Sequence, residues 1–338
     1  MANAANAIVL NIDGVSVRVS SPQRELRPGW TKMQVLQWFD AVAASLRDRI
    51  AERPLYVVRA ARTGADPFFQ KHAPAKVPEW MGTVTVPFPS GRSAVVICPR
   101  RETAIATLAW LVNLGGIEFH TWPSRAPLVE LVDELRIDLD PSEGSAWECV
   151  VEAAFEAKAL LDQHGLSPML SWSGKHGLHL VSPISPRAPF EDARAAALGV
   201  ARELERRRPD LVTASWWKEE RHAPVFCDFN QMLLDRTMAM PFSPRLPADS
   251  GVVLPLEWHQ CETFQPTEIS GAAAIDLAAP AIAAGAIRPD SATSLESLVA
   301  LHDQQRAAGM PQAPYPPHYP KAPDEPDRVT PSRGRTLR

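Results

Sequence analysis

The chain has 338 residues, of which 45% are hydrophobic and 22% are charged, and its formal net charge is −4. This is the balance of a globular protein with a sizeable core, and no uninterrupted apolar run is long enough to span a bilayer. The small net charge neither indicates nor excludes a nucleic-acid binder, because such contacts depend on local basic clusters.

Cysteine and proline usage narrow the class further. The four cysteines contain no C-x-x-C pair, which argues against a structural zinc knuckle and fits a reducing compartment. The N-terminus lacks a basic segment followed by a long apolar run, so we expect a cytoplasmic protein rather than a secreted one. The 33 prolines break up long helices and therefore argue against an all-helical bundle.

The first third of the chain predicts helices and short strands. Apolar side chains that recur every three or four residues indicate helices, and Thr31 is a suitable N-cap for the first of them. In chain order we predict a helix at 31–50, a strand at 55–59, a strand at 93–98 and a helix at 102–114. Residues 66–72 are predicted to be a loop that carries Phe68 and Phe69.

The remainder is richer in strands. In chain order we predict strands at 117–122 and 135–140, a helix at 147–163, strands at 169–172 and 178–181, a helix at 190–207, strands at 225–230 and 237–242, and a helix at 294–308. Because these helices do not alternate regularly with strands, the pattern favours an α+β fold over a doubly wound one. We expect one domain over 1–308 and a proline-rich, arginine-ended tail over 309–338, which is either a solvated terminus or an arm that contacts phosphate.

Three acidic residues on predicted strands form the first candidate site. Asp138 and Asp140 are two residues apart and so share one face of a strand, and Asp228 interrupts a second apolar strand. Neighbouring carboxylates repel each other unless a cation neutralises them, and oxygen ligands suit Mg²⁺ or Mn²⁺. The pattern indicates a site for divalent cations. The alternatives are solvated acids at the end of a strand and an ion pair from Asp228 to Arg221 or Arg236.

A glycine-flanked turn is a candidate phosphate site. Its glycines would let the backbone approach a ligand, and the turn contributes Ser173, Lys175 and His176. Arg236 and Arg245 would add fixed positive charge for phosphate. Such turns are common, so this evidence is weak by itself.

Aromatic and imidazole groups add two further candidates, each with an alternative. His120 lies on a predicted alternating strand and is either a ligand-contacting residue or a satisfied core histidine. Phe68 and Phe69, beside Lys71, could stack on bases next to a phosphate contact, or could form a hydrophobic plug.

Taken in order, four of these segments resemble the polymerase domain of bacterial ligase D, within the archaeo-eukaryotic primase superfamily. They are residues 113–123, 135–141, 173–179 and 225–228. The resemblance extends to residues 67–71, 242–245 and 320–333 and so covers nearly the whole chain. It implies a primase-polymerase core of mixed and antiparallel sheets flanked by helices. No ligase or nuclease domain is recognised in these residues, so the chain resembles a stand-alone homologue.

The resemblance implies a template-directed DNA or RNA nucleotidyltransferase that fills gaps or extends ends during non-homologous end joining. It assigns catalysis and two divalent cations, Mn²⁺ or Mg²⁺ and not zinc, to Asp138, Asp140 and Asp228. It assigns nucleotide binding to His120, Ser173, Lys175, His176, His179 and Arg245. It assigns DNA binding to Arg24, Lys32, Phe68, Phe69, Lys71 and Arg221, with Arg24 and Lys32 at the 5′-phosphate across a gap and the two phenylalanines against the template.

The implied partners are gapped or broken DNA, NTPs or dNTPs, an end-joining ligase and a DNA-end-binding protein, with no membrane. We expect a monomer at the bacterial nucleoid. The sequence departs from the family pattern at three places. His176 stands where Lys or Arg is usual, so the phosphate charge depends on pH or passes to Lys175. Met232 replaces a usual Asn, and the loop between Arg24 and Lys32 is short.

Three rival functions are worth separating. A primase that starts strands without a primer would use the same motifs. A non-catalytic DNA-end adaptor would have no reason to keep Asp138, Asp140 and Asp228, whose mutual repulsion is costly. A metal phosphohydrolase would be expected to carry histidine-rich ligand clusters, which this sequence lacks.

Overall fold

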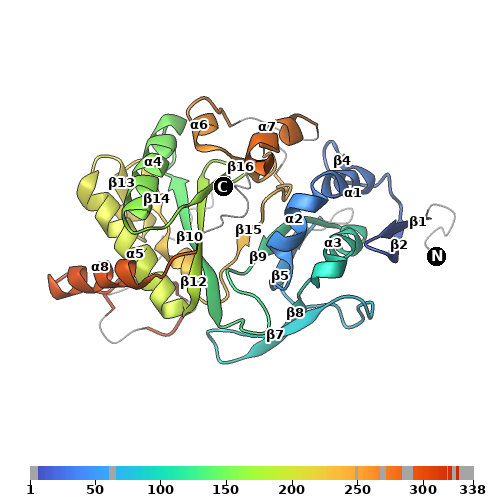
Figure 1. Cartoon of the computed structure of the whole chain (residues 1–338), viewed down its shortest axis with the longest axis horizontal. Coiled ribbons are helices and arrows are strands. Elements are labelled where there is room, and N and C mark those ends of the chain that lie inside the picture. The colour runs from blue at the N-terminus through green and yellow to red at the C-terminus, as the bar shows by residue number, and fades with distance from the viewer. Residues whose placement is uncertain are drawn as a thin grey trace, which may run out of the picture.

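The computed structural model describes residues 7–60, 66–247, 250–266, 272–283, 292–317, 319–321 and 325–326. Within these residues the strands form two six-stranded sheets and two small hairpins, and helices cover the sheets (Figure 1). The predicted α+β class is confirmed. No helix in the described part of the chain is both long and apolar enough to cross a membrane.

The first sheet carries most of the predicted acidic residues. Its order is β13 (Val212–Thr213), β14 (Val225–Cys227), β10 (Leu131–Pro141), β12 (Leu178–Pro189), β11 (Met169–Trp172) and β16 (Leu254–Leu256), and only the β13–β14 pair is parallel. Asp138 pairs with His179 across β10 and β12, and Leu139 pairs with Cys227 across β10 and β14. This register places the end of β14 beside the two aspartates of β10.

Helices α4 (Trp147–Gln163) and α5 (Phe190–Arg207) pack against β10 and β12, and α8 (Glu296–Ala307) packs on α5 (Figure 1). The remaining elements near this sheet are η3 (Lys218–Glu220), η4 (Phe229–Met232), α6 (Trp258–Cys261) and α7 (Ala272–Ala283).

The second sheet belongs mainly to the N-terminal half. Its main path is β15 (Met238–Ala239), β9 (Gly116–Thr121), β5 (Leu55–Arg59), β8 (Ser93–Ile97) and β7 (Thr83–Pro87), with β6 (Phe68–Gln70) also paired to β5. Around it lie α1 (Lys32–Ala41), α2 (Ala43–Ile50), η2 (Arg101–Thr103), α3 (Ala104–Asn113) and the hairpins β1–β2 (Ala7–Ile12, Val15–Ser20) and β3–β4 (Glu25–Arg27, Trp30–Thr31) (Figure 1). Strand β15 comes from the C-terminal half, so it joins the two parts of the chain.

Local sequence patterns predicted the helices well. Helices α4 and α5 and strands β5 and β11 have the predicted bounds. Thr31 caps α1 as expected, in a capping box with Gln34. The single helix predicted over 31–50 is instead two helices, because the backbone at Val42 (φ −104°, ψ 7°) leaves the helical region.

Several strand bounds differ from the predictions: the strand predicted at 237–242 covers only Met238–Ala239, and the strand predicted at 178–181 extends to Pro189. Residues 68–70, predicted as part of a loop, form β6, because their backbone pairs with residues 57–59 of β5. Asp228 does not interrupt a strand. Strand β14 ends at Cys227, and the Asp228 side chain caps the short helix η4 by accepting a hydrogen bond from the Asn230 N–H.

The segment after α8 carries no helix or strand in its described residues, and Ala313, Tyr319 and Glu325 are buried there against the rest of the protein. The arginines at 328, 333, 335 and 338 lie outside the described residues, so the two interpretations of the tail stay predictions.

Candidate active site

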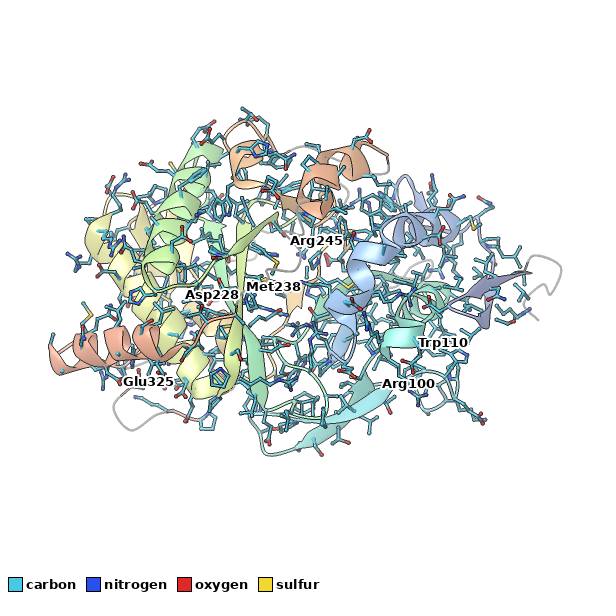
Figure 2. The ribbon with its side chains drawn as sticks, viewed as in Figure 1. Arg100, Trp110, Asp228, Met238, Arg245 and Glu325 are labelled. Atoms are coloured by element: carbon cyan, nitrogen blue, oxygen red, sulfur yellow. The ribbon has the colours of Figure 1, made fainter. Side chains whose placement is uncertain are left out.

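A pocket of about 570 Å³ opens between the two sheets. Predicted residues that line it are His120, Asp138, Asp140, Ser173, Lys175, His176, His179, Arg221 and Arg245. They come from β9, β10, the β11–β12 turn, β12 and two later loops, so the fold collects residues that are far apart in sequence. Figure 2 shows Asp228, Met238 and Arg245 in this central region.

The three aspartates lie at different depths. Asp138 is buried, Asp228 is half-buried and Asp140 is exposed at the pocket surface. The backbone N–H of Asp228 donates to the Asp138 carbonyl at 2.9 Å, which holds the two segments together. In the described part of the chain, no three His, Cys, Asp or Glu side chains form a ready metal cage.

The electrostatics of these carboxyls are unfavourable without an added cation. Partial loss of hydration among the neighbouring groups raises the pKa of each of them, including Asp140 at the pocket surface. Repulsion from Asp140 adds to this at both Asp138 and Asp228, and the pKa of Asp228 reaches about 6. The ion pairs among the described residues do not join Asp228 to Arg221 or Arg236, so that alternative is not what the structure contains.

A carboxylate that was not predicted organises the cationic side of the pocket. Glu118 Oε1 lies 3.1 Å from Arg245 Nε and 3.9 Å from Lys175 Nζ, and Glu118 Oε2 lies 3.8 Å from His120 Nε2. Burial would raise the pKa of Glu118, but His120, Arg245 and Lys175 lower it to about 2. Glu118 could have been found from the sequence, because it lies two residues before His120 on an alternating strand.

The β11–β12 turn is compact. Ser173 Oγ accepts the backbone N–H of Lys175 at 3.3 Å and of Gly177 at 3.1 Å. Gly174 has φ +75°, and a Cβ there would lie 2.7 Å from Arg245 Cγ, while a Cβ at Gly177 would lie 2.4 Å from the Leu139 carbonyl oxygen. The glycines therefore allow close packing on β10 and Arg245, and the predicted approach of this turn to a ligand stays a prediction.

The histidines of the pocket differ in exposure. His179 is buried, its Nε2 lies 3.7 Å from Asp138 Oδ1, and burial followed by the charge of Arg245 lowers its pKa to about 3. Burial also lowers the pKa of His120. Both imidazoles are therefore neutral at physiological pH. His176 is exposed and lines the pocket beside Lys175.

The predicted DNA-binding residues fall into two groups. Arg221 lines the pocket, with its guanidinium 3.6 Å from the centre of the Phe226 ring. Phe68 and Phe69 are 50% and 43% exposed, and Phe69 packs edge-on against His120. Phe69 is thus next to a pocket-lining residue, and neither phenylalanine is a buried plug.

The other basic residues are engaged by the chain itself. Lys71 Nζ lies 2.5 Å from Asp235 Oδ2. Lys32 is 2% exposed, and its Nζ donates to the carbonyl oxygens of Ser20 and Asn113 at 2.8 and 2.7 Å. Arg24 is half-buried near Gly115. Arg24 and Lys32 are thus next to the same turn and are not among the pocket-lining residues.

Further residues at the site had no signal in the sequence. Gln231 Nε2 donates to Asp138 Oδ2 at 3.0 Å, and Lys218 lines the pocket. Both are ordinary polar residues in short connecting segments, and only the folded chain brings them to the carboxylates.

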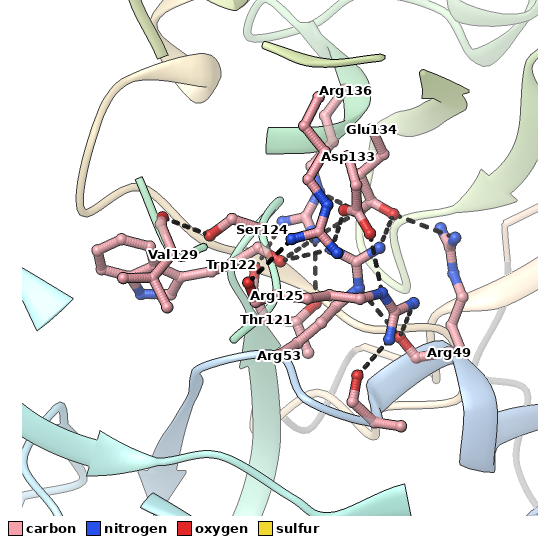
Figure 3. A network of polar contacts seen from close by, with 12 residues as sticks. Arg49, Arg53, Thr121, Trp122, Ser124, Arg125, Val129, Asp133, Glu134 and Arg136 are labelled. Carbon is pink, nitrogen blue, oxygen red and sulfur yellow. Dashed lines mark hydrogen bonds and ion pairs between the residues drawn. The ribbon is translucent and has the colours of Figure 1, made fainter. Parts of the chain in front are cut away.

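An ion-pair cluster close to the pocket links β9 and β10 (Figure 3). It consists of Arg49, Arg53, Arg125, Arg136, Asp133 and Glu134. Glu134 of β10 lies 2.6 Å from both Arg53 and Arg136, and Arg136 also donates to the Thr121 carbonyl of β9 at 2.5 Å. Burial would raise the pKa of Glu134, but the surrounding guanidinium groups hold it well below its usual value.

Comparison with known proteins identifies this arrangement. The family described as LigD, primase-polymerase domain, matches residues 31–278. The chain belongs to the LigD primase-polymerase family. Its pocket lies within the matched range, and so do all the predicted site residues except Arg24.

Individual LigD relatives agree with this assignment. The chain is 30% identical over 253 residues to the multifunctional non-homologous end joining protein LigD of Mycolicibacterium smegmatis, covering 72% of this chain and 32% of that protein. It is 30% identical over 239 residues to the bifunctional LigD protein of Bacillus subtilis, covering 69% and 37%. The chain spans about a third of the length of these relatives.

A solved structure in the LigD family has the same fold. The polymerase domain of Mycobacterium tuberculosis ligase D, in complex with DNA, matches with a TM-score of 0.70 and 26% sequence identity. The match covers 84% of this chain and 98% of that domain.

Proposed function

We propose that this chain is a template-directed nucleotidyltransferase that fills gaps or extends broken ends of DNA in non-homologous end joining. The observation that carries the proposal is the pocket itself, in which the Asp138 and Asp140 carboxylates face the Arg245 and Lys175 cations. Nucleotidyl transfer needs carboxylates that bind metal ions and basic side chains that bind a polyphosphate, and this cavity holds both. The family assignment and the DNA complex of the related domain support the choice of substrate.

The carboxylates fit two divalent cations, for which we propose Mn²⁺ or Mg²⁺. Three mutually repelling carboxyls with raised pKa values gain most from a hard cation, and their oxygens are the ligands such ions prefer. Bound to Asp138, Asp140 and Asp228, the ions would supply positive charge for the attacking and leaving oxygens of the transfer.

The chain's own side chains would orient the substrates. Arg245 and Lys175, now paired with Glu118, would turn their charge to the triphosphate, and Ser173 would donate its O–H to it. His120 and His179, both neutral, can each donate one hydrogen bond without adding charge. The exposed rings of Phe68 and Phe69 would stack on template bases, and Arg221 would contact the sugar-phosphate backbone of the DNA.

Primer extension tests this proposal directly. The purified chain is given a primed gap, a blunt end or an unprimed template, each with NTPs and with dNTPs, in Mn²⁺ or Mg²⁺. Extension at a gap or end supports our proposal, synthesis on the unprimed template alone identifies a primase, and DNA binding without extension identifies an adaptor. As partners we propose an end-joining ligase and a DNA-end-binding protein, with the chain a monomer at the nucleoid.

The β11–β12 turn offers two candidates for the phosphate contact. Lys175 already reaches into the pocket toward Glu118, whereas His176 is exposed at its edge. We expect Lys175→Ala to raise the KM for nucleotide by roughly tenfold or more, the cost of one charge-assisted contact. The KM for nucleotide of His176→Ala and His176→Lys, measured between pH 6 and 8, gives the contribution of His176 to phosphate binding. A silent Lys175→Ala with a strong His176→Ala effect would reverse the assignment.

The 5′-phosphate contact is proposed for Arg24, because its side chain is half-buried, whereas Lys32 is 2% exposed and its ammonium donates to chain carbonyls. A gapped duplex with a 5′-phosphate should bind more tightly than the same duplex with a 5′-hydroxyl, and the preference should shrink with salt. Arg24→Gln should remove most of the preference. Arg92→Gln, at an exposed arginine on the β7–β8 turn, is the matched control. Equal binding of both duplexes by the wild type would remove the pocket from the proposal.

A further inference from the structure

The segment that follows α8 is tied to the chain next to Asp228. We call residues 311–315 of this segment the strap. Arg194 of α5 is 4% exposed, and its Nη2 donates to the carbonyl oxygens of Ala313 at 3.1 Å and of Pro314 at 3.3 Å. The guanidinium also lies 3.8 Å from the centre of the Tyr315 ring. Arg194 therefore holds the strap by hydrogen bonds and by stacking.

Asn230 connects the strap to Asp228. It is fully buried, its Oδ1 accepts Arg194 Nε at 2.9 Å, and its Nδ2 donates to the Pro314 carbonyl at 3.1 Å. Its backbone N–H donates to Asp228 Oδ1 at 2.9 Å. A continuous series of hydrogen bonds thus runs from α5 and the strap, through one asparagine, to the carboxylate.

The local structure around Asp228 is weak without this support. Asp228 follows the three-residue strand β14 and begins the single turn η4, and neither element is long enough to hold a carboxylate by itself. The hydrogen bonds that the Asn230 side chain makes with Arg194 and with the Pro314 carbonyl, which we call the clamp, fix η4. They thereby fix the N–H that orients Asp228 Oδ1. The strap lies beyond the residues that match the family, which end at 278.

We propose that Arg194 is a positioning residue for Asp228, acting through Asn230 and the strap. The inference rests on the proposed function, because it takes Asp228 as a ligand of a divalent cation. A carboxylate held in one orientation loses less freedom when an ion binds, so the clamp should strengthen cation binding before any nucleotide or DNA is present.

The test measures Mn²⁺ binding to the full chain without substrate, by the loss of the free-ion electron paramagnetic resonance signal. Asn230→Ala keeps the backbone N–H but removes the clamp, and Arg194→Lys keeps the charge but loses the paired geometry. We expect both to weaken Mn²⁺ binding by roughly 10- to 100-fold, as loss of an outer support of a metal ligand does. Raised Mn²⁺ should restore primer extension in both.

Arg202→Lys is the matched control. Arg202 also lies on α5 and donates to the strap at the Pro311 carbonyl, but it does not contact Asn230. It should bind Mn²⁺ as the wild type does, although the strap has lost one of its contacts. A loss of affinity equal to that of Arg194→Lys would show that the strap acts as a whole and would overturn the specific role of Arg194.

Two further outcomes separate this inference from the proposed function. If Asp228→Asn weakens Mn²⁺ binding but a folded Asn230→Ala does not, the positioning role is wrong and the cation site stands. If Asp228→Asn itself binds Mn²⁺ normally, the proposed cation site is wrong, and the inference falls with it. Circular dichroism and the Tm establish that each variant is folded. If Arg194→Lys does not fold, the Mn²⁺ affinity of Asn230→Ala, which is the smaller change, tests the positioning role.

Discussion

Asp138→Asn and Asp228→Asn are expected to reduce nucleotide addition by roughly a thousandfold or more. Each removes the negative charge of a proposed cation ligand and so weakens binding of the cations that the transfer needs. Binding of a gapped duplex should stay close to that of the wild type, since the basic and aromatic residues proposed to bind DNA are unchanged. Primer extension in Mn²⁺ and a duplex-binding titration measure the two effects. Near-normal extension by either variant would contradict the proposed ligands.

Asp228→Asn should stabilise the folded protein when no metal is bound. The pKa of Asp228 in the folded chain is about 6, above its unfolded value of 3.8, so its ionised form opposes folding above pH 6 and this cost disappears as the carboxyl protonates. In chelator at pH 7.5, Asp228→Asn should melt a few degrees above the wild type. The gap should shrink toward pH 5.

Burial lowers the pKa values of His120 and His179, so these histidines reduce the stability of the wild type and of Asp228→Asn as the pH falls. The comparison is therefore made between variant and wild type at each pH. Mn²⁺ should raise the Tm of the wild type by much more than it raises the Tm of Asp228→Asn, because only the wild type keeps the full ligand set. A pH-independent gap would contradict the electrostatic explanation.

Glu134→Gln is expected to cost about 3–5 kcal/mol of folding free energy, because it leaves buried arginines without their shared counter-charge. For a chain of this size the Tm should fall by roughly 5–15 °C. The pKa of Glu134 is lowered, so its stabilisation is fully present above its unfolded value of 4.5 and is lost only as the pH falls through the lowered one. The Tm difference should therefore persist from pH 8 to pH 5.

Glu130→Gln is the control for this experiment, since Glu130 is an exposed carboxylate four residues earlier in the chain. It should change the Tm by less than about one degree. Extension activity should fall in Glu134→Gln more than folding alone explains, because the cluster joins β9 and β10, which both line the pocket. A Tm within one degree of the wild type would show that the cluster contributes nothing net.

Local patterns in the sequence carried much of the fold. The helix bounds of α4 and α5 follow from the spacing of apolar residues, and the Thr31 cap follows from residue type and position. Asp138 and Asp140 were found because alternate residues of a strand share a face, a rule that needs no knowledge of other strands. The ordered motifs then indicated the family, which the comparisons confirm.

Other features depend on partners that are distant in sequence. Residues 68–70 become a strand only because β5 pairs with their backbone, and Lys32 becomes a buried support only because the ends of β2 and α3 supply carbonyl oxygens. Glu118 gains its role from Arg245, which comes from a separate loop. No local periodicity encodes such meetings.

The sequence alone thus determined the fold class and the family and indicated the acidic residues that we propose as ligands, because these depend on short-range spacing and on motif order. Tertiary structure alone decided how Asp228 is held. Asp228 follows β14, its carboxylate accepts the Asn230 N–H, and Arg194 and the strap hold the Asn230 side chain. These contacts combine segments that are more than eighty residues apart in the sequence. Each contact is an ordinary hydrogen bond whose partner is chosen by the packing of α5, η4 and the strap, and that packing is a property of the whole folded chain.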